Sequence, residues 1–97
     1  MKAIFISYNQ AYHEEILDIM EKNSVKGYTY WNEVRGRGSR GGDPHLGDHA
    51  WPTLNGAILA VVEDETEQPF LQKLHDLDAR AEAMGLRAFS WKVDATV

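Results

Sequence analysis

The segment 56–63, which reads GAILAVVE, carries apolar side chains at every position from Ala57 to Val62. Such a short aliphatic run, entered through Asn55-Gly56, predicts a strand. Alternate side chains of a strand point to opposite faces, so both faces of this strand are apolar. An antiparallel sheet with one face in water alternates apolar and polar residues instead. The fold must therefore cover both faces of the sheet that contains this strand.

Short runs rich in β-branched and aromatic residues predict three further strands. They are KAIFISY at residues 2–8, YTYWNEV at residues 28–34 and LRAFSWKV at residues 86–93. The first run is continuously apolar from Ala3 to Ile6, so it repeats the two-sided pattern. In the last run, Phe89, Trp91 and Val93 share one face.

Two segments repeat apolar residues at helical spacing. The first spans residues 10–23, with Asn9 as its N-cap, and its apolar face consists of Tyr12, Ile16, Ile19 and Met20. The second starts at a capping-box pattern, Asp64-x-x-Glu67, and stops at Gly85. Its apolar face consists of Phe70, Leu74, Leu77, Ala81 and Met84.

The resulting order βαββαβ predicts an α+β, ferredoxin-like fold in a single domain over residues 1–97. In this fold, a four-stranded antiparallel sheet carries both helices on one face. No remaining segment is apolar enough to cover the other face. Burying each large apolar side chain is worth about 1.5–3 kcal/mol, so leaving several in water is costly. We therefore expect copies of the chain to pack sheet against sheet in a homo-oligomer.

Composition excludes several classes of protein. The chain has no cysteine, so disulfides and thiolate metal sites are impossible. Its formal net charge of −5 argues against broad nucleic-acid affinity, and the acidic stretch 63–84 is typical of a solvated helix face. The opening apolar run is too short for a signal peptide or a membrane span. We expect a cytoplasmic protein that binds no nucleic acid and inserts into no membrane.

A long irregular segment, residues 35–52, separates the second and third predicted strands. It holds five of the eight glycines, and loops of this length in small domains are usually functional or disordered. Gly36-x-Gly38-x-x-Gly41 matches a dinucleotide fingerprint, but Gly42-Asp43-Pro44 cannot open the helix that this motif requires. Backbone N–H groups of a glycine-rich turn can instead form an anion-binding nest.

Arginines accompany these glycines, so one interpretation places a phosphate at the base of the loop. The other interpretation is a soluble loop that binds nothing. Under the first interpretation, the candidate ligand-binding residues are Arg35, Gly36, Arg37, Gly38, Ser39 and Arg87.

His45 and His49 support a metal-binding interpretation of the same loop. Asp43 and Asp48 add oxygen ligands for the metal, and His13 can add an imidazole ligand from outside the loop. A set of imidazole and carboxylate ligands suits zinc, copper or nickel. The alternative is a pair of polar histidines with structural hydrogen bonds.

Trp51-Pro52 and Arg40 are the candidates for contact with a partner protein, since Trp and Arg are enriched at such interfaces. The alternative for Trp51 is to anchor the loop to its own oligomer.

The stretch GYTYWNEVRGRGSRGG resembles the PII signalling proteins, in which a glycine and a β-rich run precede a Val-basic-Gly-x-Gly pattern. Gly27, Val34, Arg35, Gly36 and Gly38 carry this resemblance. It implies a homotrimer with three sheets packed into a central core. It also implies that residues 36–55 correspond to the T-loop, the long segment that each PII subunit projects between its second and third strands.

The resemblance extends to Arg87, which stands where PII proteins have a lysine that contacts a nucleotide phosphate. Two features depart from the PII pattern: AMGLRAF replaces GDGKIF, and no tyrosine lies between Arg35 and Pro52. The resemblance implies a role in signal transduction of the kind used in nitrogen regulation. Its ligand would be an adenine nucleotide or another anion, bound in the cleft between subunits.

No nucleophile–base pair and no spaced pair of carboxylates is evident, so we expect no catalysis. RNA-recognition modules share the element order but display aromatic residues on the third strand, and AILAVV has none. We expect a regulatory protein whose ligand orders the loop for contact with a transporter or an enzyme. The alternative function is divalent-metal binding through His45 and His49, as in the cation-tolerance proteins of the same superfamily.

Overall fold

The computed structural model of the chain describes residues 1–37, 46–47, 54–80 and 85–97. In these ranges the elements are, in chain order, β1 (Lys2–Asn9), the 3-10 turn η1 (Gln10–Tyr12), α1 (His13–Lys22), β2 (Tyr28–Val34), β3 (Asn55–Val62), α2 (Asp64–Arg80) and β4 (Arg87–Lys92). The predicted βαββαβ order is therefore confirmed.

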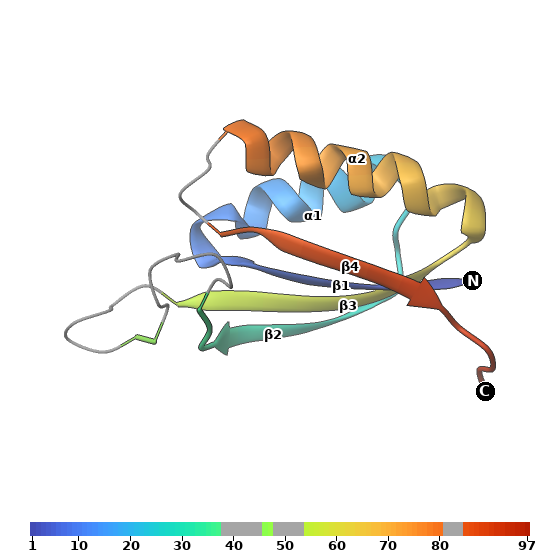
Figure 1. Cartoon of the computed structure of the whole chain (residues 1–97), viewed down its shortest axis with the longest axis horizontal. Helices are drawn as coiled ribbons and strands as arrows, with labels where there is room; N and C mark the ends of the chain where they lie inside the picture. The colour runs from blue at the N-terminus through green and yellow to red at the C-terminus, as the bar shows by residue number, and fades with distance from the viewer. Residues whose placement is uncertain (38–45, 48–53, 81–84) are drawn as a thin grey trace.

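The strands form one antiparallel sheet in the order β2-β3-β1-β4. Both helices lie on the same face of this sheet (Figure 1). This is the ferredoxin-like arrangement, so the predicted fold class is confirmed. The ends of β1 and β2 and the starts of β3 and β4 meet at one end of the sheet, which we call the loop end, and both chain termini lie at the other end (Figure 1).

The core lies between the sheet and the two helices. Ile4, Ile6 and Tyr8 project from β1 into it and are fully buried. The helices contribute Ile16, Met20, Phe70, Leu74 and Leu77. Helical spacing predicted all five of these positions, because residues three, four or seven apart share a helix face. Ile19 is only partly buried against this core, and Ala81 and Met84 lie outside the described residues.

The start and the end of the first helix differ from the prediction. The chain first turns through η1, whose N-cap is Asn9: the Asn9 Oδ1 accepts a hydrogen bond from the Ala11 N–H at 2.9 Å. The α-helix then begins at His13 rather than at Gln10. It ends at Lys22, two residues before Ser24, which has a left-handed φ of 59°. The helix therefore ends one residue before the predicted end at residue 23.

The second helix does not start with the predicted capping box. Asp64 is already the first residue of α2, and its carboxylate pairs with the Met1 ammonium at 2.9 Å. This hydrogen bond and the positive charge lower the pKa of Asp64. The carbonyl of Glu63 accepts the Thr66 N–H at 3.0 Å, so Glu63 belongs to the helix start and not to β3.

The sheet face that carries no helix, which we call the open face, is apolar. Phe89, Phe5 and Leu59 form one cross-strand row on it, and Trp91, Ala3 and Val61 form the next row. Phe89 is 59% exposed, Trp91 49%, Val61 46% and Trp31 44%. Exposed large apolar side chains gathered on one face mark an interaction surface. The prediction that the sheet is apolar on both faces is thus confirmed.

Candidate functional site

The long segment between β2 and β3 leaves and re-enters the fold at the loop end of the sheet. The pairing of β2 with β3 shifts register between Trp31 and Val34, after which Val34 pairs with Asn55. Such an irregularity redirects the strand and the side chains that follow it. Arg35 therefore leaves the regular sheet and lies exposed beside its end.

The structure gives a reason for the glycine at position 36, which lies close to the start of β3. A Cβ atom on Gly36 would lie 3.0 Å from the Asn55 side-chain amide, which is closer than an ordinary van der Waals contact. The first glycine of the loop therefore allows the outgoing chain to pass close to the incoming strand.

Gln10 joins both ends of the loop to the turn that follows β1. Its backbone N–H donates to the Leu54 carbonyl at 3.1 Å, just before β3. Its side-chain Nε2 donates to the Asn32 carbonyl of β2 at 2.6 Å. One residue of η1 thus holds the strands on either side of the loop. No sequence pattern pointed to Gln10, because both partners lie more than twenty residues away along the chain.

The open face is hollowed at the loop end. A cavity of about 400 Å³ is lined by Phe5, Ser7, Trp31, Val34, Arg35 and Ala57. Its walls are mostly apolar, and Arg35 is the cation on its rim. An aromatic side chain beside a guanidinium suits a ligand with one flat apolar part and one anionic part.

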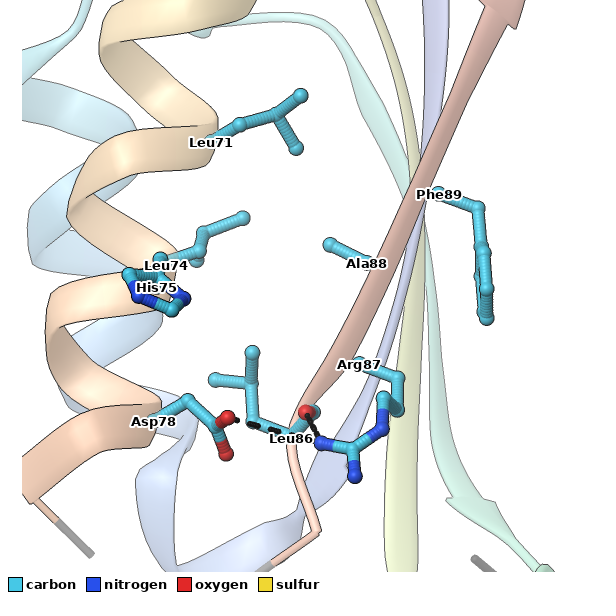
Figure 2. Close-up of a pocket in the computed structure, with 8 residues that line it drawn as sticks. All are labelled: Leu71, Leu74, His75, Asp78, Leu86, Arg87, Ala88 and Phe89. Atoms are coloured by element: carbon cyan, nitrogen blue, oxygen red, sulfur yellow. Dashed lines mark hydrogen bonds and ion pairs between the residues drawn. The ribbon is translucent and has the colours of Figure 1, made fainter. Parts of the chain in front are cut away.

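A second hollow of about 600 Å³ lies between α2 and β4 (Figure 2). It is lined by Leu71, Leu74, His75, Asp78, Leu86, Arg87, Ala88 and Phe89. Figure 2 shows Ala88 directed toward α2 and Phe89 on the opposite side of β4. Arg87 bends back toward the helix: its Nη1 donates to the Leu86 carbonyl at 2.7 Å and lies 3.6 Å from the Asp78 Oδ2.

The two hollows lie at the same end of the sheet. Ser7, which lines the first, pairs in register with Arg87, which lines the second, and with Ala57 of the first. Trp31 pairs with Ala57 in turn. Arg87, Ser7, Ala57 and Trp31 therefore form one row across the sheet, with Arg35 just beyond the end of β2. The structure thus places both arginines at the loop end, on opposite edges of the sheet.

Several predicted site residues lie outside the described part of the chain: Gly38, Ser39, Arg40, Asp43, His45, Asp48, His49 and Trp51. The other predicted ligand-binding residues lie at the loop end: Arg35 and Arg37 are exposed, Gly36 is half-buried, and the Arg87 side chain is 47% exposed. Within residues 1–37, 46–47, 54–80 and 85–97, no three histidine or acidic side chains are grouped as metal ligands would be.

His13 belongs to an aromatic cluster at the loop end. Its Nδ1 lies 2.7 Å from the hydroxyl of the buried Tyr8, and its ring stacks on Tyr30 with centroids 4.2 Å apart. Burial raises the pKa of Tyr8, and the neighbouring Tyr30 raises it further. Gly56 gives the Tyr8 ring its space, since a Cβ atom there would lie 2.9 Å from that ring. No sequence pattern pointed to this cluster, because its members lie on β1, α1 and β2 and meet only in the folded chain.

The architecture defines a class: a small ferredoxin-like domain with an exposed apolar sheet face and a long segment between β2 and β3 that starts with Arg35 and Arg37. None of its described helices is long and apolar enough to cross a membrane. The family model for the nitrogen regulatory protein P-II matches residues 1–97. The chain therefore belongs to the P-II family of regulatory proteins. No curated protein sequence matches it.

Solved structures of PII-like proteins share the fold. CPII from Thiomonas intermedia, bound to ADP, AMP and bicarbonate, is 24% identical with a TM-score of 0.72, over 97% of this chain and 88% of that one. A protein described as PII-like and signalling, from Thermus thermophilus, is 20% identical with a TM-score of 0.67, over 95% and 85% of the two chains. The apo form of CPII is also similar, with 21% identity and a TM-score of 0.67, over 95% and 89%.

Proposed function

We propose that this protein is a non-catalytic, trimeric sensor of the P-II family. It binds an adenine nucleotide or another small anion in the cleft between subunits, at the loop end of the sheet. The bound ligand orders the long loop, which then contacts a partner protein. The observation that carries this proposal is the position of Arg35 and Arg87: both lie at the loop end, on opposite edges of a sheet whose open face is apolar.

The open face supports the assembly of copies. Its exposed side chains come from three strands, namely Trp31 of β2, Val61 of β3, and Phe89 and Trp91 of β4. Removing apolar surface from water yields about 25 cal/mol per Å². In a P-II-like trimer the same face of two other copies covers these side chains. Such an assembly also places the loop ends of neighbouring subunits beside one another.

The arginines support an anionic ligand. A guanidinium offers several N–H donors in a planar fork, which matches the oxygens of phosphate or bicarbonate. Arg35 lies on the hollow at the loop end of the open face, where such an anion can reach it. The ADP, AMP and bicarbonate bound to CPII support these ligand classes for a chain of the same family.

The loop completes the proposal. A ligand that binds one arrangement of the loop base more tightly shifts the population toward that arrangement. The transition of a segment from a disordered to an ordered state is a common form of such a switch. Arg40 and Trp51 are then the residues that contact a transporter or an enzyme.

Isothermal titration calorimetry of the full chain with AMP, ADP, ATP and bicarbonate tests this function. We expect heat with at least one nucleotide, and at least tenfold weaker binding for Arg35→Ala. Lys26→Ala is the matched control, since this exposed cation lies just before β2, at the opposite end of the sheet. Absence of heat with all four ligands contradicts the proposal. Heat with zinc alone, abolished by His45→Ala together with His49→Ala, would indicate the metal-binding alternative.

A further inference from the structure

Arg87 faces an acidic side chain across the hollow between α2 and β4 (Figure 2). The Asp78 Oδ2 lies 3.6 Å from the Arg87 Nη1, and the Asp78 side chain is 27% exposed. The other oxygen, Oδ1, is buried and has no hydrogen-bond partner in the described part of the chain. A carboxylate with one buried oxygen left without a donor is an unusual arrangement, because such groups are normally satisfied.

The contact between Asp78 and Arg87 has the geometry of a loose ion pair. A charge-assisted hydrogen bond between nitrogen and oxygen is about 2.7–2.9 Å long, whereas this separation is 3.6 Å. The firm bond of the guanidinium is its 2.7 Å donation to the Leu86 carbonyl. Partly exposed pairs of this kind add little to stability. Stability therefore does not account for an acid at position 78.

The charge of Asp78 has a direct effect on any anion that reaches Arg87. The carboxylate attracts the same guanidinium that the anion needs, and it repels the anion itself. Both effects lower the affinity. The repulsion also grows with the negative charge of the ligand, because Coulomb energy is proportional to the product of the charges.

We propose that Asp78 is a specificity-determining residue that selects ligands by charge. It competes with the bound anion for Arg87, so it favours nucleotides that carry fewer phosphates. This inference rests on the proposed function, since it takes the nucleotide phosphates to be the partners of Arg87. In the free protein the guanidinium donates to the Leu86 carbonyl and lies beside Asp78, so an anionic ligand competes with the carboxylate for it.

The test is titration of the wild-type chain and of Asp78→Asn with AMP, ADP and ATP. Asparagine keeps the shape of the side chain and removes its charge. We expect Asp78→Asn to bind ADP about three- to tenfold more tightly. The gain should be larger for ATP and smaller for AMP, and raising the salt concentration should reduce it. Asp76→Asn is the matched control: Asp76 lies on the same helix, is exposed and bonds to Gln72, so its removal should leave the ranking unchanged.

Equal or weaker binding of ADP by Asp78→Asn overturns the inference, because Asp78 would then position Arg87 rather than oppose its ligand. If Asp78→Asn does not fold, Asp78→Ser removes the same charge, and the same ranking is expected of it. Asp78→Glu, which restores the charge, should restore the wild-type order. Binding by Asp78→Asn but not by wild type supports the inference. Absence of binding in both overturns the proposed function and the inference together, whereas equal binding overturns only the inference.

Discussion

The hydroxyl of Tyr8 lies 2.7 Å from Nδ1 of His13, and this contact joins the end of strand β1 to the first residue of α1. The His13 ring also stacks on Tyr30 of β2. Three elements therefore converge at the loop end, beneath the strands that carry the long loop.

The first prediction concerns Gly56, which pairs with Tyr8 across the sheet. In Gly56→Ala, the new methyl group would lie 2.9 Å from the Tyr8 ring, so the ring or β3 must move. Overpacking of this kind costs about 1–3 kcal/mol. We expect the free energy of unfolding, measured in urea, to fall by that amount.

Gly27→Ala is the control for this experiment. A Cβ atom on Gly27 meets nothing within 4 Å, so no packing penalty arises. Alanine also reduces the conformational entropy of the unfolded chain. Its stability should change by less than about 0.5 kcal/mol. Equal losses for the two variants would show that space beside Tyr8 is not what requires glycine at position 56.

The second prediction concerns the Tyr8 hydroxyl. Tyr8→Phe keeps the ring and removes the bond to His13, which should cost about 1 kcal/mol at neutral pH. Thermal unfolding followed by circular dichroism measures this loss. An unchanged melting temperature would mean that the hydroxyl contributes nothing to the fold.

The difference in stability between wild type and Tyr8→Phe should also depend on pH. Burial raises the pKa of Tyr8 above its ordinary value near 10, so the unfolded state loses its proton first as the pH rises. The stability due to the neutral hydroxyl is fully present below pH 10 and is lost above it, by about 1.4 kcal/mol for each pH unit. Urea unfolding between pH 8 and about 11 should therefore show wild type losing its advantage over Tyr8→Phe above about pH 10. A constant difference across this range would contradict the prediction.

The fold could be predicted because its signals are local or periodic. The spacing of Ile16 and Met20, and of Phe70 and Leu74, reports a helix face directly. The uninterrupted apolar run of β3 in the same way requires a sheet that is apolar on both faces. These inferences depend only on residues a few positions apart, and burial in the structure agrees with them.

The candidate site could be predicted only in part, because its geometry depends on contacts between distant residues. The glycines and Arg35 marked the loop base, and a family resemblance singled out Arg87. The direction of the Arg87 guanidinium toward Asp78 depends on how α2 packs beside β4, and spacing carries no such information. Gln10 was missed for the same reason, since its partners lie on other strands.

The third prediction concerns Gln10 as the link between the two ends of the loop. Gln10→Ala removes the 2.6 Å side-chain bond to Asn32 but keeps the backbone bond to Leu54. Because the site is partly exposed, the global loss of stability should stay near 0.5–1 kcal/mol. Amide hydrogen exchange should rise locally, in the segment from Asn32 to Arg35, and not in α2. Uniform acceleration across the chain would indicate general destabilisation instead.

The last prediction tests the open face. Val61 lies on the central strand β3 and is 46% exposed in the single chain, so Val61→Lys should leave the fold intact. In a trimer whose sheets pack together, the lysine ammonium would be buried without a partner, which costs several kcal/mol per subunit. Light scattering should therefore show a trimer for wild type and an 11.0 kDa monomer for the variant. Gln72→Lys places the same side chain on the exposed surface of α2 and should remain trimeric. A monomeric wild type, or a trimeric Val61→Lys, would mean that the open face is not the surface through which the copies assemble.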